Sequence, residues 1–410
     1  MIDAVGEQLL SARITNDEGT LDALIDKVLA LADDGEVLWA VDINRGGAAL
    51  LVGLLAARHQ PVAFLTGLMM HRAAAGYRGE GKTDARDAFM IADQARVRRD
   101  INLLRPENEI AADLRILTAR RLDVVYDRTR QINRLRAQLL EVCPALERAL
   151  TVTNTGPLVL LTRYQTPAQI RRAGPVRIEA WLRKQHVRGA ESLAQRAKTA
   201  AAAQRIVLAG EAAAAKVVAR IAQGIIALDA EIAELDAAIE ARFLEHSAAP
   251  AILSLPGFGP KIGVEFIAAT GGDMSVFTGV NQLAGLAGLA PRPRDSGKIS
   301  GNLHRPKRYH RTLLRTMYIS AQVSIRHSAA SHAFYQRKRS EGKSHKQAVI
   351  ALARRRLNVL WAMLRDGTTY QDPRPAREPG FVPGRSDSTT VGSYECEHRP
   401  GGRPLGCAAS

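Results

Sequence analysis

The sequence predicts an α/β domain at the N-terminus, followed by a chain that is mainly helical. Two short apolar runs, residues 37–41 and 62–65, flank an apolar segment at residues 48–59. Apolar runs of this length are typical of buried strands, and the segment between them has the length of a helix. A strand–helix–strand unit favours parallel strands. After residue 109, helical spacing of apolar residues dominates the sequence.

The charge of the chain indicates a phosphate-rich partner. Its 410 residues carry a formal net charge of +16, and clustered Arg and Lys favour nucleic acids, whose binding is driven by counterion release. A basic composition typical of a GC-rich genome is the alternative. The three Cys residues lack the paired spacing of a zinc site or a disulfide framework. No apolar run is long enough to span a bilayer, so we expect a cytoplasmic, nucleoid-associated protein.

Three Asp residues are candidate ligands for a divalent metal. Asp42 follows the first strand, and the carboxyl ends of central strands are where such sheets place chemistry. Asp84 and Asp87 lie three residues apart on an Ala-rich helical pattern, which places them on one helix face. Mg²⁺ takes oxygen ligands and keeps open positions for phosphate. The alternatives are a turn-capping Asp42 and a solvated, salt-bridged helix face at residues 82–88.

Two long helical segments follow. Residues 110–146 form an Arg-rich helix whose charges either pair with Asp123 and Asp127 or contact phosphate. Residues 199–244 carry a heptad seam of apolar residues that alternate three and four apart, namely Val218, Ile221, Ile225, Leu228, Ile232, Leu235 and Ile239. The seam can pair within the chain or between chains. We favour an intermolecular coiled coil, which predicts a homo-oligomer, either a dimer or a tetramer.

A further domain is expected from about residue 250. Residues 255–263 resemble the turn of a helix–hairpin–helix, whose backbone N–H groups can hold a phosphate. A plain Gly/Pro turn between two helices is the alternative. Towards the C-terminus the chain is rich in Pro, Gly, Ser and Arg, which predicts a disordered tail at residues 373–410.

The loop at residues 291–308 contains Ser296, which is flanked by Gly297 and surrounded by cations. An exposed Ser of this kind is a candidate nucleophile toward a phosphodiester, because the cations stabilise the charge that builds on the phosphoryl oxygens. A Ser on a basic loop can also be a simple phosphate contact. The predicted nucleic-acid-binding residues of the chain are Lys261, Arg292, Arg294, Lys298, Arg305, Lys307, Arg308, Arg311, Arg337, Lys338 and Arg339.

Several motifs occur in the order found in one family of transposases. They are WAVDINRGG, GYRGEGKTDARDAFMIADQAR, LPGFGPKIGVEFIAATGG, AGLAPRPRDSGKISGNLHRPKRYHR and AFYQRKRSEGKSHKQAVIALARRRLNVLWAMLRDG. With these motifs the chain resembles the DEDD-type transposases of insertion-sequence family one-hundred-ten, which are kin to the Piv-type DNA invertases. The resemblance extends to about residue 370.

The resemblance implies a RuvC-like (RNase H-like) domain at residues 1–108, a helical coiled-coil middle at 109–248 and a mainly helical transposase domain at 249–372. It implies that Asp42, in place of the usual Glu, holds Mg²⁺ together with Asp84 and Asp87. It implies further that Ser296 is the nucleophile. The expected partners are DNA and a structured guide RNA that the element encodes.

The first residues depart from the family pattern. Family members begin with a strand bearing a first Asp, whereas Met1-Ile2-Asp3 resembles a later segment, so we expect Asp3 to be the turn residue of a hairpin. Either the start codon is assigned too late or the copy is truncated. The alternative function is therefore a truncated, non-catalytic remnant that binds RNA and DNA. In an active recombinase, Ser296 would work opposite the carboxylates of another domain, which a partner chain could supply.

Overall fold

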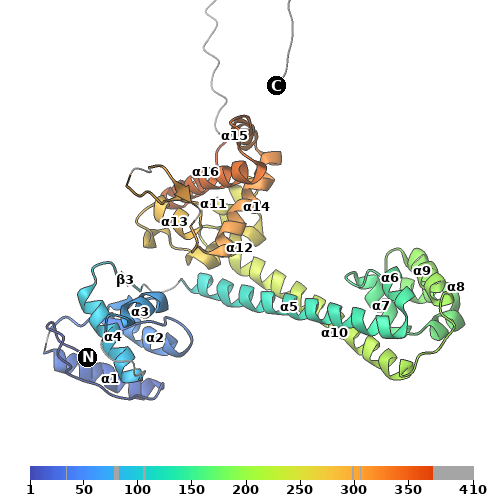
Figure 1. Cartoon of the computed structure of the whole chain (residues 1–410), viewed down its shortest axis with the longest axis horizontal. Helices are drawn as coiled ribbons and strands as arrows, with labels where there is room; N and C mark the ends of the chain where they lie inside the picture. Colours follow the sequence, from blue (N-terminus) through green and yellow to red (C-terminus); the bar gives the residue numbers. More distant parts are fainter. Residues whose placement is uncertain (34, 78–82, 105–107, 298–299, 305, 373–410) are drawn as a thin grey trace, which may run out of the picture. The chain divides into compact units, whose positions relative to one another are not determined.

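Helices dominate the described part of the chain (Figure 1). The structure is a computed structural model and describes residues 1–33, 35–77, 83–104, 108–297, 300–304 and 306–372. The predicted disordered tail therefore lies outside the described residues. Within the described ranges, no helix combines the length and the apolar character needed to cross a membrane.

The first residues form a tight turn held by one side chain. Asp3 Oδ1 accepts hydrogen bonds of 2.8–3.0 Å from the backbone N–H groups of residues 5–7. Ile2 and Gln8 form an antiparallel bridge across the turn. Gly6 has a φ of +98°, which a residue with a Cβ rarely adopts. The prediction that Asp3 is a hairpin-turn residue is confirmed.

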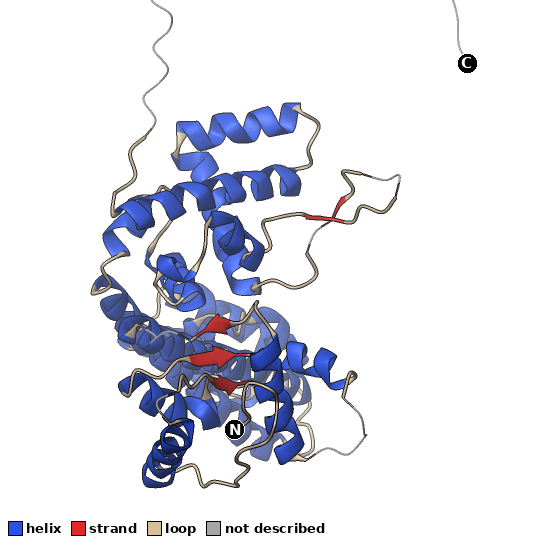
Figure 2. Cartoon of the chain, turned by 90° about the vertical axis from the view of Figure 1, so that its left-hand side faces the viewer, coloured by secondary structure: helices blue, strands red, loops and turns tan. Residues whose placement is uncertain are grey.

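The predicted strand–helix–strand unit is present. β1 (Trp39–Val41) pairs in parallel with β2 (Val62–Phe64), and the two are joined through η1 (Gly46–Ala48) and α2 (Ala49–Ala57). β3 (Asn102–Leu103) adds antiparallel to β2 (Figure 2). The other helices here are α1 (Glu18–Ala32), α3 (Gly67–Ala74) and α4 (Asp84–Val97). The expected α/β-plus-helical architecture is confirmed, and a RuvC-like relation stays a prediction.

Both faces of this small sheet are covered by helices. Val62 packs with Ile25 of α1 and Leu55 of α2, whereas the next residue, Ala63, packs with Met90 of α4. Successive residues of a strand point to opposite faces. It follows that α1 and α2 cover one face and α4 the other, which brings α4 against the sheet beside β1.

Two long helices pack antiparallel along each other (Figure 1), namely α5 (Glu109–Val142) and α10 (Glu211–Leu244). Arg242, near the end of α10, pairs with Asp113, near the start of α5, at 2.8 Å. Arg128 of α5 forms an ion pair with Asp229 of α10. Arg128 therefore pairs across the helices, whereas Arg130 pairs with Asp127 within α5, as one alternative of the sequence suggested.

The heptad seam of α10 packs within the chain. Val218, Ile225 and Ile239 are buried, and the remaining seam residues are half-buried. α10 packs mainly against α5 and α7 of the same chain, which is the intrachain pairing that the sequence left open as an alternative. Self-association of the helix pair stays a prediction.

A helical lobe is inserted between α5 and α10. Its helices are α6 (Pro144–Ala149), α7 (Thr155–Arg163), α8 (Pro167–Lys184) and α9 (Ala190–Ala202). Their apolar faces enclose a core that contains Leu158, Ile178 and Leu193. Leu139 of α5 and Val218 of α10 belong to the same core. The lobe is therefore built onto one end of the helix pair.

The C-terminal helices surround a second large core. The elements are α11 (Ala249–Ser254), α12 (Pro260–Thr270), η2 (Met274–Val276), α13 (Val280–Leu286), β4 (Arg292–Pro293), β5 (Leu303–His304), α14 (Arg311–His327), α15 (Ala329–Ser340) and α16 (His345–Asp366). Phe266, Met317 and Leu357 lie in this core together with Leu114 of α5 and Phe243 of α10. The other end of the helix pair is thus anchored here.

Candidate functional site

The predicted acidic residues lie at the ends of two elements of the sheet domain. Asp42 follows β1 directly and is half-buried. Asp84 and Asp87 occupy the first turn of α4, whose N-cap is Thr83. The Thr83 hydroxyl accepts a hydrogen bond of 3.3 Å from the Arg86 backbone N–H. Carboxylates in a first helical turn are favoured by the helix dipole, which accounts for their place in the fold without any ligand.

The three carboxylates do not form a metal site in this structure. Among the residues that the structure describes, no group of three or more His, Cys, Asp or Glu side chains lies close enough to hold a metal ion. The oxygen donors have the right chemistry for Mg²⁺, but the geometry of Asp42, Asp84 and Asp87 does not fit a shared ion. Metal binding at these residues stays a prediction.

A neighbouring carboxylate, that of Asp93, is held by a hydrogen bond and an ion pair within the domain. Asp93 of α4 accepts a hydrogen bond of 2.7 Å from the Tyr77 hydroxyl and pairs with Arg96 at 2.6 Å. The Tyr77 hydrogen bond and the Arg96 charge lower the pKa of Asp93. No such partner of Asp42, Asp84 or Asp87 occurs in the described ranges. Asp84 is exposed, and Asp42 and Asp87 are half-buried.

Ser296 lies in a β-hairpin that stands out from the C-terminal helices (Figure 2). In the hairpin β4 pairs antiparallel with β5, with Arg292 opposite His304. The Asn302 backbone N–H donates to Asp295 Oδ1 at 3.0 Å, and the Arg294 N–H donates to the Asn302 carbonyl at 2.8 Å. Asp295 is thereby engaged in holding the hairpin. The adjacent Ser296 is exposed.

The predicted nucleic-acid-binding cations fall into three groups. Arg292, Arg294, Lys307, Arg308 and Arg311 are exposed around the hairpin, whereas Lys298 and Arg305 lie outside the described residues. The others are engaged by protein groups. Lys261 pairs with Asp236 at 2.9 Å, Lys338 pairs with Glu341 at 2.7 Å, and Arg339 donates to the Lys343 carbonyl at 2.6 Å. The hairpin therefore carries exposed cations that are not engaged in the ion pairs named above.

A cation cluster on α15 and α16 includes one residue, Arg355, that is not among the predicted nucleic-acid-binding residues. Arg337, Lys338 and Arg355 all approach the Phe334 ring, with their charged groups 5.1, 5.6 and 5.2 Å from its centroid. Such contacts stabilise a cation over an aromatic face. Spacings of three and four residues from Phe334 could have revealed the first two partners. Arg355 comes from another helix and could not be placed.

The predicted helix–hairpin–helix turn is packed into the protein. Gly257 has a φ of +84°, and a Cβ there would come within 2.6 Å of the Ser320 carbonyl of α14. The Pro256 carbonyl accepts a hydrogen bond from Arg356, a buried residue of α16. These contacts support the alternative reading, a Gly/Pro turn between α11 and α12. A phosphate contact at this turn stays a prediction.

Comparison with known proteins identifies the family. A profile of DEDD transposases of the IS110 type matches residues 1–144, and a profile described as the transposase IS116/IS110/IS902 family matches residues 249–336. Over 371 residues the chain is 55% identical to an uncharacterized 42 kDa protein of insertion element IS900 from Mycobacterium paratuberculosis. That match covers 90% of this chain and 93% of the relative. The chain is a transposase of the IS110 family.

Other relatives extend the comparison. The transposase is 45% identical to an uncharacterized 44.8 kDa protein of insertion element IS116 from Streptomyces clavuligerus, over 92% of this chain and 94% of the relative. It is 32% identical over 132 residues to a pilin gene-inverting protein of Moraxella bovis, a match that covers 31% of this chain and 39% of the relative. Asp42, Asp84 and Asp87 lie in the first profile match, and Ser296 lies in the second.

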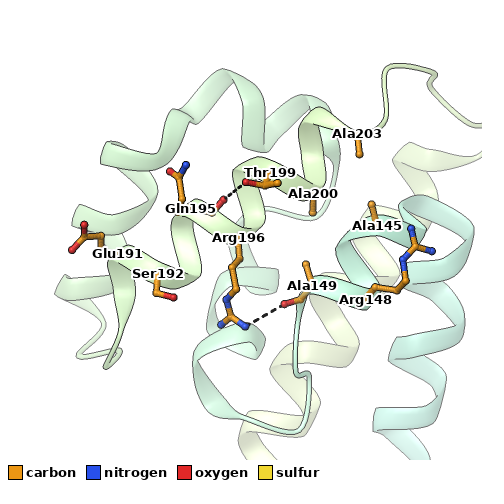
Figure 3. Close-up of a pocket in the computed structure, with 10 residues that line it drawn as sticks. All are labelled: Ala145, Arg148, Ala149, Glu191, Ser192, Gln195, Arg196, Thr199, Ala200 and Ala203. Carbon is orange, nitrogen blue, oxygen red and sulfur yellow. Dashed lines mark hydrogen bonds between the residues drawn. The ribbon is translucent and has the colours of Figure 1, made fainter.

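The lobe of the transposase carries a hollow of about 740 Å³ between α6 and α9 (Figure 3). Ala145, Ala149, Ala200 and Ala203 are among its lining residues, and no aromatic side chain lines it. Arg196 at its edge donates a hydrogen bond of 3.4 Å to the Ala149 carbonyl. The hollow is therefore lined in part by small side chains and by an Arg that already donates a hydrogen bond. It lacks the aromatic ring on which a nucleobase would stack.

Proposed function

We propose that this transposase recombines the DNA of an insertion element through a covalent intermediate on Ser296. Ser296 Oγ attacks the scissile phosphorus, a new Oγ–P bond forms, and the bond from phosphorus to one deoxyribose oxygen breaks. The serine hydroxyl loses its proton, and the leaving oxygen gains one. The main support is the position of Ser296, exposed on a basic hairpin in a chain that belongs to a transposase family.

The cations of the hairpin fit this chemistry. In the transition state, negative charge builds on the oxygens of the phosphoryl group that is transferred, and nearby guanidinium groups stabilise it. Arg donates two parallel hydrogen bonds to a phosphate, which also orients the group for attack. Arg292, Arg294 and Arg308 are exposed and available for this role.

The acidic residues form the second part of the proposal. We infer that Asp42, Asp84 and Asp87 act together in the metal-dependent part of recombination, since these carboxylates lack hydrogen-bonding partners among the described residues. Among the described residues the geometry does not assemble these carboxylates into a metal site. The proposal also includes an element-encoded guide RNA and a dimer or tetramer, in which a partner chain brings its carboxylates to Ser296.

A covalent adduct tests the role of Ser296. The protein is incubated with DNA that carries both element ends and with the element-encoded RNA, and the products are run on a denaturing gel. We expect a protein–DNA band that Ser296→Ala loses. Ser300→Ala is the matched control, because Ser300 is an exposed Ser of the same hairpin, and it should keep the band. A band that persists in Ser296→Ala contradicts the assignment.

A second candidate function is binding without catalysis. The absence of a three-carboxylate group among the described residues favours it. A non-catalytic protein would bind DNA and RNA through the same exposed cations and would form no covalent adduct. The unsubstituted protein would then bind DNA but form no covalent adduct, with or without a divalent metal. That result would favour this candidate over the transposase chemistry.

A further inference from the structure

A second hollow lies at the base of the Ser296 hairpin. It measures about 700 Å³, within the range of about 300–1,000 Å³ that is typical of small-molecule sites. α13 contributes Gly285 and Leu286 to its lining, and the two ends of the hairpin contribute Arg292 and Arg308. Gln282 of α13 and three rings, those of Phe277, Tyr309 and His310, complete the lining.

The rings are held in place by the surrounding protein. Phe277 packs edge-to-face on Trp361, with a centroid distance of 6.2 Å. Tyr309 lies so close to Gly288 that a Cβ there would come within 2.6 Å of Tyr309 Cγ, and Gly288 has a φ of +67°. The His310 backbone N–H donates to the Leu286 carbonyl at 2.8 Å. The hollow is therefore formed before any ligand binds.

The chemistry of the lining selects for a nucleotide. Fixed aromatic rings offer stacking faces, which any nucleobase can use. Arg292 and Arg308 are exposed beside these rings, and Arg binds phosphate in a bidentate manner. The residues that line the hollow include no Asp or Glu, so the charge at its edge is complementary to a phosphate. A paired base cannot enter such a hollow, because it is stacked within its duplex.

We propose that this hollow binds a single unpaired nucleotide, with its base against Phe277 and Tyr309 and its phosphate against Arg292 and Arg308. The proposal rests on the proposed function, since the nucleotide would belong to the strand that Ser296 attacks or to the RNA that guides it. The hollow between α6 and α9 lacks aromatic rings and is not expected to bind a base.

Gly285 offers a way to fill the hollow without disturbing the fold. A Cβ built at Gly285 meets no atom within 4 Å, and the residue lies inside α13. Leu favours helices more than Gly does, so Gly285→Leu should fold and occupy the space that a base would take. Gly224→Leu is the matched control, because Gly224 lies within α10 and also has no atom within 4 Å of a built Cβ.

The probes are three DNA duplexes of one sequence. One carries a single unpaired 2-aminopurine, the second has an abasic unit at that position, and the third is fully paired. We expect the full-length protein to bind the 2-aminopurine duplex at least about fivefold more tightly than the abasic one, the low end for stacking one base on an aromatic ring. The fluorescence of the 2-aminopurine should fall on binding. Gly285→Leu should lose both effects but bind paired DNA like the parent protein, and Gly224→Leu should keep both.

Equal affinity of the parent protein for the 2-aminopurine and abasic duplexes would overturn the proposal. So would a base preference that survives in Gly285→Leu. A ribonucleotide in place of the unpaired deoxynucleotide distinguishes the sources, since tighter binding of the ribose form assigns the hollow to RNA. The Ser296 adduct is measured in the same samples. An adduct without a base preference refutes the hollow alone, and a base preference with an adduct that persists in Ser296→Ala refutes the nucleophile alone.

Discussion

Arg356 of α16 donates a hydrogen bond of 2.9 Å to the Ser320 hydroxyl of α14, and both residues are buried. The same guanidinium donates to the Pro256 carbonyl in the turn before α12. Burial lowers the pKa of Arg356 to about 10, so the side chain stays protonated at neutral pH. One buried cation thus joins three segments of the C-terminal core.

We therefore expect Arg356→Ala to destabilise this core strongly. The change leaves the Pro256 carbonyl and the Ser320 hydroxyl without a donor, and each buried group left in this way costs about 1–3 kcal/mol. Urea unfolding followed by circular dichroism measures the loss. Arg355→Ala is the control, since Arg355 is the exposed neighbour on the same helix. Equal midpoints for the two variants would refute the structural role of Arg356.

His310 predicts a pH-dependent contribution to stability. Its Nδ1 caps α14 by accepting a hydrogen bond of 3.2 Å from the Leu313 N–H, and desolvation lowers its pKa. A lowered pKa in the folded state means that the unfolded chain binds the proton more readily. The contribution is therefore complete above the unfolded value of about 6.5 and is lost as the pH falls through the lowered folded value.

His310→Asn should remove this dependence, because Asn caps a helix without titrating in this range. The free energy of unfolding is measured for both proteins at about pH 8 and about pH 5, on either side of the unfolded value. Burial also lowers the pKa of His246, but this residue is present in both proteins, so the difference between them isolates position 310. If both lose the same stability on acidification, His310 does not titrate as described.

Asp84→Asn tests the acidic residues apart from the fold. Asp84 is exposed in the first turn of α4, so its replacement should change the free energy of unfolding by no more than about 0.5 kcal/mol, as is usual at surface positions. If the residue acts in metal-dependent recombination, strand transfer with Mg²⁺ should be abolished, as it should be in the parent protein with EDTA. Full activity of Asp84→Asn would remove this residue from the site.

Self-association is now best tested away from the buried end of the seam. Ile225 lies in the lobe core, so Ile225→Asp should unfold the lobe and says nothing about oligomers. Leu122 and Tyr126 of α5 are 47% and 54% exposed. If the helix pair joins two chains, Leu122→Asp with Tyr126→Asp should give a monomer by light scattering with an unchanged melting temperature. An unchanged mass would place the contact elsewhere.

Local patterns predicted the elements of the fold well. The apolar runs at β1 and β2 and the segment between them gave the parallel unit, because burial in a sheet demands continuous apolar residues. The long Arg-rich helix was expected to reach residue 146, but α5 ends at Val142 and Pro144 starts the next helix. Pro lacks the N–H that would continue the hydrogen-bonding ladder. The Ala-rich segment at residues 199–244 likewise contains a break, at residues 203–210, whereas its heptad seam lies wholly within α10.

Contacts between distant segments could not be predicted from spacing. The turn at residues 255–263 matches a phosphate-binding pattern, but its carbonyl is engaged by Arg356, about a hundred positions further along the chain. Lys261 is predicted from the sequence to bind nucleic acid, and in the structure its exposed side chain pairs with Asp236. The candidate metal site depends on the distance between Asp42 and the pair Asp84 and Asp87. Local sequence patterns do not determine that distance.

The lobe is inserted between α5 and α10, and the chain enters and leaves the lobe at neighbouring positions. The Gln204 side chain, shortly before α10, donates a hydrogen bond of 2.8 Å to the carbonyl of Val142 at the end of α5. A segment with adjacent ends can be lengthened, shortened or exchanged at little cost in loop-closure entropy. The two family profiles match residues 1–144 and 249–336 and leave the lobe unmatched. Because the ends of the lobe lie side by side, a short linker between α5 and α10 should leave the C-terminal core able to fold.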